Sequence, residues 1–387
     1  MEKNLGIYIH IPFCERKCSY CGFLSFPLSD GEKNSLDNYV DCLCKEITYM
    51  ANHYSKQYIV DTIFIGGGTP SLLKQSQIVK IMTTLKAGFN ISKDVEITIE
   101  SNPNSLDMEK LTTYIQSGIN RLSMGVQSFD DEILKKIGRI HNEKIAIKAF
   151  EMARNAGFKN INIDLMFALP GQSEAIWKQT LEKAFQLKPE HFSFYSLQIE
   201  EGTPFYKSYK DEKLDVPSDE VSDNMYKTAL KLIKDNKYDH YEISNCSKIG
   251  YNCKHNIKYW QMDDYLAFGL GASGYVSGYR YTNPEDFNSW KQQVLNEILI
   301  EDRQDADFES LETGMSVFCF TALRTAKGID FANFKKRFGV SFLDVYKDKI
   351  DFINEEVSKG NMILSENNLS LTADGILISN DLMCEFV

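Results

Sequence analysis

The sequence predicts an α/β protein: a partial (β/α)6 barrel followed by a smaller C-terminal helical, winged-helix-like domain. Three observations predict this architecture. From residue 5 to about 200, short apolar runs alternate with longer stretches of helical period. Cysteine, glycine and polar motifs follow the apolar runs. After about residue 305, helical stretches lead to a hairpin pattern and a last helix. A chain of 387 residues has room for a large barrel with an appended domain.

Six segments have the composition of buried strands, with many β-branched residues. They are residues 5–10, 60–65, 95–100, 120–126, 160–166 and 191–198. Five stretches of helical period lie between them, at residues 36–54, 73–87, 107–117, 143–156 and 174–186. Strands that alternate with helices in this way form parallel βα units with right-handed crossovers.

The positions of the unusual residues favour an open barrel over a doubly wound sheet, a choice that periodicity leaves open. In barrels, functional side chains gather at the carboxyl ends of the strands. The motifs that follow or end the first five strands are, in order, Cys14, GGGTPS (66–71), ESNP (100–103), Gln127 and Asp164. A barrel would collect all of them at one rim.

The rest of the chain predicts a connecting segment and a terminal domain. A helix near 218–235 and the strand-like YDHYEIS precede the aromatic, glycine-rich stretch NCKHNIKYWQMDDYLAFGLGASGY. Helices near 307–322 and 342–358 then lead to MILSENNLSLT, which predicts a hairpin turning at Asn367 and Asn368. The predicted parts are the barrel, the connecting segment and the helix-plus-wing domain, at residues 1–240, 241–304 and 305–387.

Composition excludes several classes of protein. A net charge of -11 without a clustered basic face argues against a nucleic-acid groove, so we expect no nucleic-acid partner. No apolar run reaches the roughly 20 residues of a membrane span, and the first residues enter a strand rather than a basic, apolar leader. We therefore expect a cytoplasmic protein, in which nine cysteines favour metal or redox use over disulfides.

Cys14, Cys18 and Cys21 lie within eight positions, a spacing that suits zinc or an iron–sulfur cluster. A structural zinc ion takes four protein ligands, and His10 is a candidate for the fourth. In the alternative, the three thiolates hold three irons of a 4Fe-4S cube and leave one iron open to an exchangeable ligand. Three unrelated structural cysteines are the remaining possibility.

The CxxxCxxC spacing resembles that of the radical S-adenosylmethionine (SAM) superfamily. The resemblance implies that the amine and carboxylate of SAM bind the open iron. It also implies that the reduced cluster can cleave a carbon–sulfur bond of SAM to give a 5'-deoxyadenosyl radical, a chemistry that belongs to the cofactor.

Residues near the other strand ends offer what a SAM molecule needs. Glycines 66–68 let backbone approach a ligand closely, although an ordinary tight turn would also explain them. Glu100 can accept from a ribose diol or ammonium, and Arg139 can pair with the methionyl carboxylate. Gln127 and Asp164 can bond polar groups of the nucleoside. Each could singly be a solvated surface residue, but their joint placement indicates a site.

The run YIHIPFCERKCSYCGF, with GGGTPS, ESNP, GVQSF and GRIH, is similar to the family of the oxygen-independent coproporphyrinogen III oxidase and its heme chaperone branch, HemW. The resemblance covers nearly the whole chain. It implies cluster ligation by Cys14, Cys18 and Cys21. It implies SAM contacts from Tyr8, Tyr20, Gly67, Gly68, Thr69, Glu100, Gln127, Arg139 and Asp164.

Two departures from the oxidase pattern favour the chaperone branch. The oxidase has a further cysteine where this chain has Phe23, and it has a longer segment before the cluster motif, where this chain has 13 residues. Both put decarboxylation in doubt.

HNIKYW (255–260) looks like the HNxxYW signature of the HemW branch. Imidazole of His255 can be an axial heme ligand, and Tyr259 and Trp260 offer flat faces to a porphyrin. Cys253 could ligate or attach to heme instead. Core aromatics, with His255 satisfied by a hydrogen bond, are the alternative. An auxiliary cluster on Cys246 and Cys253 lacks further ligands.

The expected function is therefore a heme chaperone in porphyrin metabolism that carries a 4Fe-4S cluster and SAM. It would pass heme to an acceptor hemoprotein, such as a respiratory membrane enzyme. Coproporphyrinogen III oxidation and SAM-dependent modification of heme are the enzymatic alternatives. The C-terminal wing resembles a winged helix, but the one basic run, KKRFG (335–339), is more typical of a solvated helix end.

Overall fold

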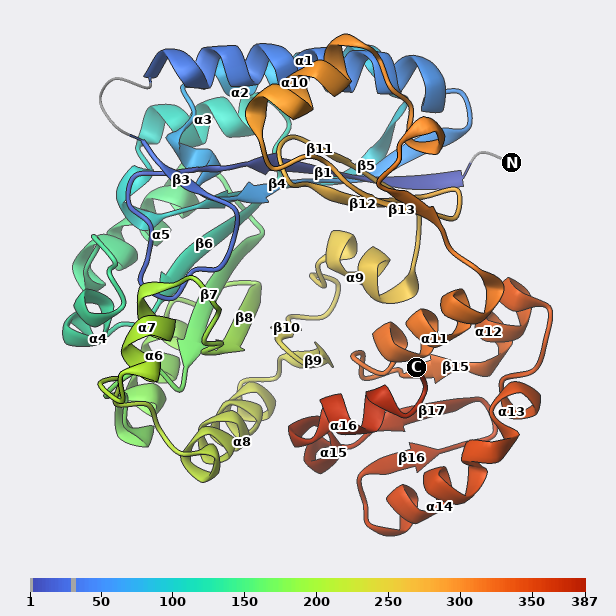
Figure 1. The fold of residues 1–387 in the computed structure, drawn as a ribbon. Coiled ribbons are helices and arrows are strands. Elements are labelled where there is room, and N and C mark those ends of the chain that lie inside the picture. Colours follow the sequence, from blue (N-terminus) through green and yellow to red (C-terminus); the bar gives the residue numbers. More distant parts are fainter. Residues whose placement is uncertain (1–2, 29–32) are drawn as a thin grey trace.

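The computed structural model describes residues 3–28 and 33–387 (Figure 1). Each of the six predicted strands is present and pairs in parallel with the next along the chain. They are β1 (Lys3–Ile11), β4 (Tyr58–Gly67), β5 (Ile91–Ser101), β6 (Arg121–Gln127), β7 (Ile161–Phe167) and β8 (His191–Ser196).

The five predicted helices are also present and cover the outer face of the sheet in Figure 1. They are α1 (Lys33–Tyr54), α2 (Gln75–Gly88), α3 (Met108–Gln116), α5 (Glu143–Ala156) and α6 (Glu174–Gln186). Side-chain caps fix several starts, because the first N–H groups of a helix need acceptors. Asn142, for example, accepts from the N–H of Ile145 at the start of α5.

The sheet is curved but open, which confirms the partial barrel. Its order is β14-β13-β12-β11-β1-β4-β5-β6-β7-β8-β10-β9, and no pairing joins the two edges among the described residues. Of the strands that flank the six, only β9 was predicted, from the strand-like YDHYEIS. The flanking strands are β9 (Asp239–Glu242), β10 (Asn245–Ser247), β11 (Tyr265–Phe268), β12 (Ser273–Val276), β13 (Tyr279–Thr282) and β14 (Ala306–Phe308).

The barrel strands have one apolar and one polar face, because side chains alternate along a strand. On β7, Ile161, Ile163 and Leu165 are buried in the hydrophobic core that the sheet shares with its outer helices. Asn162 and Asp164 point the other way, toward the inside of the barrel. The inner side also holds α9 (Lys254–Gln261), which lies beneath the sheet in Figure 1.

Short elements complete the barrel region. They are β2 (Phe13–Cys14), β3 (Phe26–Pro27), α4 (Asp131–Lys136), α7 (Pro204–Lys210), α8 (Asp219–Asp235) and α10 (Phe287–Leu295). The helix predicted near 218–235 is therefore α8, and the YDHYEIS strand is β9.

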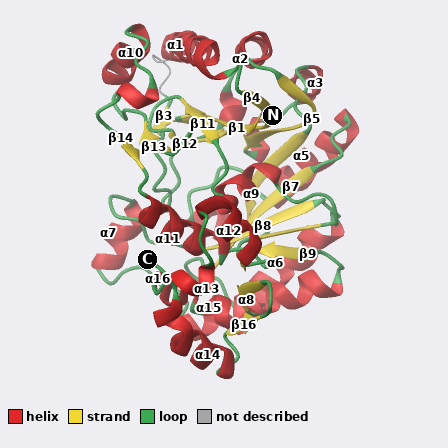
Figure 2. Ribbon diagram, turned by 90° about the vertical axis from the view of Figure 1, so that its right-hand side faces the viewer, coloured by secondary structure: helices red, strands yellow, loops and turns green. Residues whose placement is uncertain are grey.

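The C-terminal region has its own hydrophobic core and a small sheet in the order β15-β17-β16. Figure 2 shows it in front of α9 and β8. Its elements are α11 (Leu311–Ala322), β15 (Ile329–Asp330), α12 (Phe331–Phe338), α13 (Phe342–Val345), α14 (Ile350–Ser358), β16 (Met362–Leu364), β17 (Asn368–Leu371), α15 (Ala373–Leu377) and α16 (Ser379–Cys384).

Two local predictions for this region were wrong. The helix expected at 342–358 is broken, because Tyr346, with φ of -101° and ψ of 31°, leaves the helical conformation after α13, and α14 begins only at Ile350. The predicted hairpin forms, but its loop precedes Asn368, which already belongs to β17 and pairs with Asp330. The division at residues 240 and 304 stays a prediction. Within residues 3–28 and 33–387, no helix has the length and apolar character needed to cross a bilayer.

Candidate functional site

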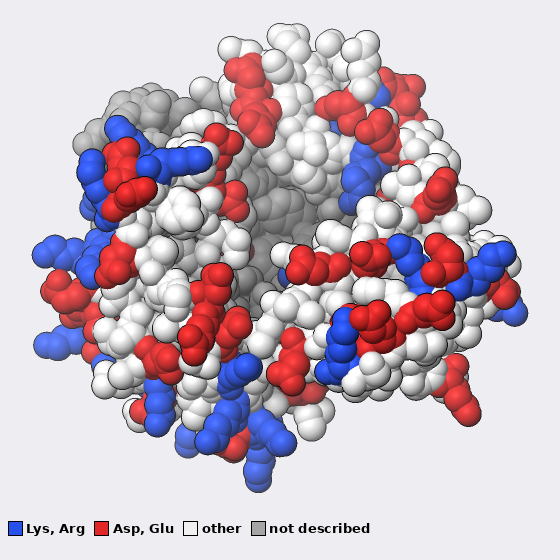
Figure 3. Space-filling view, turned by 60° about the horizontal axis from the view of Figure 1, so that its bottom comes forward, with Lys and Arg blue, Asp and Glu red and all other residues white. Residues whose placement is uncertain are grey.

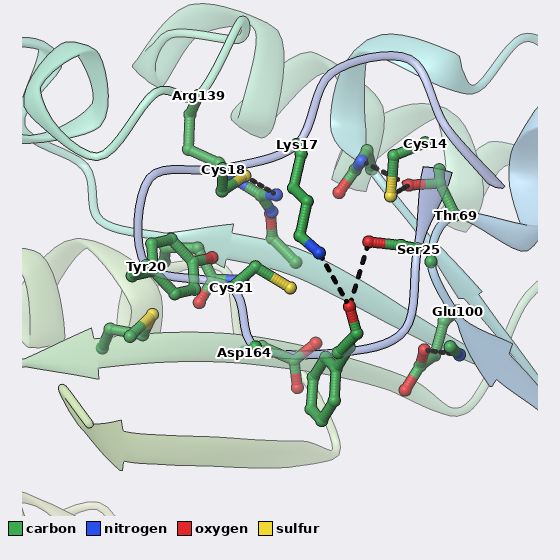
Figure 4. Close-up of a pocket in the computed structure, with 18 of the residues that line it drawn as sticks. Cys14, Lys17, Cys18, Tyr20, Cys21, Ser25, Thr69, Glu100, Arg139 and Asp164 are labelled. Carbon is green, nitrogen blue, oxygen red and sulfur yellow. Dashed lines mark hydrogen bonds between the residues drawn. The ribbon is translucent and has the colours of Figure 1, made fainter. Parts of the chain in front are cut away.

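A cavity of about 600 Å³ opens at the carboxyl ends of the barrel strands, a volume typical of small-molecule sites (Figure 4). It brings together all three clustered cysteines and all but one of the predicted SAM residues. Those that line it are Cys14, Cys18, Cys21, Tyr20, Gly67, Gly68, Thr69, Glu100, Gln127, Arg139 and Asp164.

Tyr8 is the predicted SAM residue that does not line the cavity. It lies on the inner face of β1, where its hydroxyl is 2.9 Å from Nδ1 of His10. The other ring nitrogen of His10 lies 2.9 Å from the carbonyl of Leu24. Because both nitrogens of His10 are engaged, this side chain has no free lone pair for the zinc site that the sequence left open.

We call residues 13–28 the cluster loop. Its two ends are held together because β2 pairs with β3. The carbonyl of Phe23 accepts from Lys17 at 3.2 Å and from Ser25 at 3.3 Å, as Figure 4 shows. These bonds fold the loop so that its three sulfurs face one cavity. The ring of Phe23, at the position where the oxidase pattern has a cysteine, lines the cavity and is 69% exposed.

The thiols have polar neighbours that suit deprotonated sulfur. Cys14 accepts from the hydroxyl of Thr69, and Cys18 from Nη1 of Arg139, each at 3.5 Å. Burial acts in the opposite sense and raises the pKa of Cys14 and that of Cys21, whereas the bond from Thr69 lowers the pKa of Cys14. Nε of Arg139 is buried without a hydrogen-bond partner. Thiolates are the donors that iron–sulfur clusters take, so this donor set fits such a cluster.

The described residues contain no group of three His, Cys, Asp or Glu side chains close enough to hold one metal ion. The three cysteines of the cluster loop nevertheless line one cavity. In an iron–sulfur cube each thiolate binds a different iron.

The glycine loop after β4 is packed against the cluster loop. The N–H of Gly68 donates to the carbonyl of Ile11 at 2.9 Å, and a Cβ on Gly68 would lie 2.6 Å from the carbonyl oxygen of Phe13. Gly67 has φ of +109° and donates its N–H to Glu100 at 3.0 Å. Only glycine can be placed this close to neighbouring backbone, so the turn is tight and also forms a wall of the cavity.

Two acids with unusual electrostatics face the cavity. Burial, and secondarily the charge of Asp164, raise the pKa of Glu100 to about 8, although its bond from Gly67 acts in the opposite sense. Burial also raises the pKa of Asp164, against the effect of its hydrogen bonds with Ser193 and Asn162. Perturbed carboxylates in a cavity are typical of functional sites.

Gln127 lies at an irregular point of the sheet. The register between β6 and β7 shifts between Gly125 and Gln127, and Gln127 has φ of +68°. A non-glycine residue in this region costs of order 1–3 kcal/mol, and such strain is often found where a side chain must face a ligand. The side chain of Gln127 lines the cavity.

The sequence reasoning missed further lining residues. They are Arg16, Lys17, Gly22, Ser25, Ser101, Asn102, Gly125, Met166, Tyr195, Ser196, Gln198 and Glu200. A two-residue alternation of polar and apolar side chains could have found some of them. In NINIDLM, Met166 lies two residues after Asp164 and therefore shares its face of the strand. In HFSFYS, Tyr195 lies four residues after His191 and shares its face in the same way.

The HNIKYW motif forms α9 and lies on the inner face of the barrel. His255 is fully buried, with Nδ1 2.9 Å from the hydroxyl of Thr62 and Nε2 2.9 Å from that of Tyr259. Burial lowers the pKa of His255 to about 3. Its ring also stacks on Phe64, with ring centroids 5.4 Å apart. In this conformation His255 is a satisfied core side chain, which is the alternative that the sequence allowed.

The other candidate heme residues are also engaged. Cys253 is fully buried at the start of α9, where Glu96 accepts from its thiol at 3.7 Å and from the N–H of His255 at 3.1 Å. Trp260 stacks against Arg324 of the C-terminal region, 4.7 Å from the guanidinium carbon to the ring centroid. Heme contacts from Cys253, His255, Tyr259 and Trp260 stay a prediction, and any with His255 or Cys253 would require α9 to move.

Comparisons with known proteins define the class. Residues 8–184 match the model of the radical SAM superfamily, and residues 310–378 match the HemN C-terminal domain. The solved structure of coproporphyrinogen III oxidase (HemN) from Escherichia coli has the same fold, with a TM-score of 0.84, 22% identity, and coverage of 100% of this chain and 90% of that one. The fold is thus that of a radical SAM protein.

Relatives of similar sequence identify the branch. The chain is 35% identical to the heme chaperone HemW of Bacillus subtilis, over 98% of each chain. It is 33% identical to the HemW of Lactococcus lactis, over 100% of this chain and 98% of the relative. The HemW of Escherichia coli is 38% identical over 70% of each. The chain belongs to the HemW family, which confirms the resemblance found in the sequence.

Proposed function

We propose that this protein is a cytoplasmic heme chaperone that binds heme and transfers it to an acceptor hemoprotein, with a 4Fe-4S cluster and SAM in the barrel cavity. The observation that carries the chaperone function is the similarity over the full length to relatives named heme chaperone HemW. A respiratory membrane enzyme is the acceptor we expect.

The cavity supports the cofactor part of the proposal. Cys14, Cys18 and Cys21 would hold the cluster, and the glycine wall, Glu100 and Asp164 would face SAM. The cluster, when bound with SAM, supplies one-electron chemistry. The protein's own contribution is to place thiols, a buried guanidinium and two carboxylates around one space, so that a cationic, amine-bearing ligand meets acceptors.

Heme titration of the purified protein, with and without SAM, tests the chaperone function. We expect stoichiometric heme binding, seen in the absorbance of the heme. Absence of stoichiometric binding would overturn the proposal. Formation of protoporphyrinogen from coproporphyrinogen III under anaerobic conditions with SAM and a reductant would instead establish the oxidase, and SAM-dependent change of the bound heme would establish a heme-modifying enzyme.

Three variants separate a ligand role of the motif from a packing role. His255→Ala and Cys253→Ala each remove a candidate heme ligand. Thr62→Val removes the hydroxyl partner of His255 without removing any candidate ligand. Loss of heme binding in His255→Ala alone would assign His255 as the ligand. Equal losses in His255→Ala and Thr62→Val would mean that heme binding depends on how α9 packs against the barrel.

A further inference from the structure

A continuous chain of hydrogen bonds runs through the barrel interior from the cavity to the first turn of α9. It begins at Asp164, whose Oδ1 lies 2.7 Å from Nδ2 of Asn162. Oδ1 of Asn162 lies 2.7 Å from Nδ1 of His191, and Nε2 of His191 lies 2.7 Å from the hydroxyl of Tyr241. The hydroxyl of Tyr241 accepts from the N–H of Cys253 at 3.2 Å.

The donor and the acceptor of each hydrogen bond in this series follow from the groups at its two ends. A backbone N–H can only donate, so the hydroxyl oxygen of Tyr241 accepts from Cys253 and its own hydrogen is free to go to Nε2 of His191. His191 must then carry its hydrogen on Nδ1 and donate it to Oδ1 of Asn162. The amide nitrogen of Asn162 therefore faces Asp164, which is also what an acceptor-only carboxylate requires.

The surroundings keep this arrangement neutral at its centre. His191 is fully buried, and burial lowers its pKa far below the usual value, so the ring stays uncharged. Nδ2 of Asn162 also donates to Ser123 at 2.7 Å and lies 3.0 Å from Oγ of Ser193. The charged side chains that act on Asp164 are Arg121, Arg139 and Glu100.

The end of the hydrogen-bond series at Tyr241 and Cys253 is held by further hydrogen bonds to neighbouring segments. Glu96 accepts from the N–H groups of Lys254 and His255, which holds the first turn of α9 against β5. The carbonyl of Tyr241 accepts from the N–H of Ala326, which follows α11 of the C-terminal region. The hydroxyl of Tyr241 is therefore bonded to the start of α9, and its main chain is bonded to the segment that follows α11.

We propose that His191 and Tyr241 are positioning residues for the cavity, which hold the amide of Asn162 so that the carboxylate of Asp164 faces a bound SAM as an oriented acceptor. This inference rests on the proposed binding of SAM in the cavity. It concerns residues that lie beneath the lining, because neither His191 nor Tyr241 lines the cavity.

A matched pair of substitutions at His191 tests the role. The amide of His191→Asn can replace Nδ1 as a donor to Asn162, whereas the amide of His191→Gln reaches the position of Nε2 and leaves Asn162 without that donor. Tyr241→Phe removes the hydroxyl and leaves the ring. The control is His240→Gln. His240 is a neighbouring histidine that bonds to the carbonyl of Ile243 and takes no part in the series of hydrogen bonds from Asp164 to Cys253.

The measurement is SAM affinity of the reconstituted protein by equilibrium dialysis, with thermal unfolding of each variant recorded beside it. Losing an oriented, charge-assisted bond weakens affinity roughly 10- to 100-fold. We expect that loss in His191→Gln, a smaller one in Tyr241→Phe, and near-wild-type affinity in His191→Asn and His240→Gln. A merely structural His191 would lower unfolding temperature and affinity alike in both of its variants.

The possible failures are distinguishable. If wild-type protein does not bind SAM, the proposed cofactor site is wrong. If wild-type protein binds SAM and His191→Gln binds it equally well, or His191→Asn and His191→Gln lose affinity equally, the positioning role is wrong and the site remains. Should His191→Gln not fold, Tyr241→Phe decides, and unchanged affinity in that variant overturns the inference.

Discussion

Replacing Glu100 by glutamine should stabilise the protein and weaken its ligand site. The pKa of Glu100 rises from 4.5 to about 8 on folding, mainly because of burial. The folded state therefore binds this proton more tightly than the unfolded state. Stability is largest when the carboxyl is protonated in both states, and it falls as the pH rises from about 4.5 to about 8.

The magnitude follows from the size of this change. At about 1.4 kcal/mol for each pH unit, Glu100 costs about 3 kcal/mol of unfolding free energy at pH 7 and up to about 5 kcal/mol above pH 8. Glutamine has the shape of the protonated acid and can still accept from the N–H of Gly67. Glu100→Gln should therefore be about 3 kcal/mol more stable at pH 7 and close to the wild type near pH 4.5.

Urea unfolding of the protein prepared without iron or SAM, at several pH values from 5 to 8, measures this difference. Glu151→Gln, at an exposed position of α5, is the control and should stay within about 0.5 kcal/mol of the wild type. SAM affinity of Glu100→Gln, measured above pH 8 where the wild-type carboxyl is charged, should fall roughly tenfold or more, since a neutral amide then replaces a charged acceptor. A variant that is less stable than the wild type at pH 8, or that keeps the wild-type pH dependence, would refute the reasoning.

Three further predictions concern the loops around the site and the terminal domain. Alanine at any one of the three cysteines of the cluster loop should remove nearly all iron–sulfur absorbance after reconstitution, whereas Cys42→Ala should retain it; equal loss in Cys42→Ala would mean that the ligands are misassigned. Gly68→Ala should weaken SAM binding at least about tenfold, because its Cβ would lie 2.6 Å from a backbone oxygen; wild-type affinity in equilibrium dialysis would contradict this. Gly314 lies inside α11, and a Cβ added to it would have its nearest contact at 3.5 Å. Gly314→Ala should therefore raise the free energy of unfolding, measured with urea, by about 0.5–1 kcal/mol. A lower free energy of unfolding than that of the wild type would contradict this.

The face in Figure 3 carries acidic and basic side chains intermixed, with acidic groups near its central hollow and no continuous basic stripe. Of the basic run at the end of α12, Lys335 and Lys336 are exposed and Arg337 makes contacts within the molecule. Arg337 donates to the carbonyl of Met262 at 2.9 Å and pairs with Asp263 at 3.6 Å, so it joins the C-terminal region to the end of α9.

The sequence by itself determined the barrel strands, their helices and the rim on which the motifs meet. These features depend on short-range periodicity and on a general rule of parallel sheets, so Cys14, Gly67 and Asp164 could be placed together without coordinates. The superfamily and its branch also followed from local motifs that keep their spacing along the chain.

Only the tertiary structure decided what the buried polar residues do. The letters HNIKYW suit a porphyrin and a packed core equally, and the burial of His255 between Thr62 and Tyr259 cannot be read from them. Likewise, alternation shows that Asn162 and His191 face inward, but their link to Tyr241 exists because β9 and β10 return beside β8. Such partners are distant in sequence, and the physical reason is that a hydrogen bond depends on positions in space that long-range chain packing alone sets.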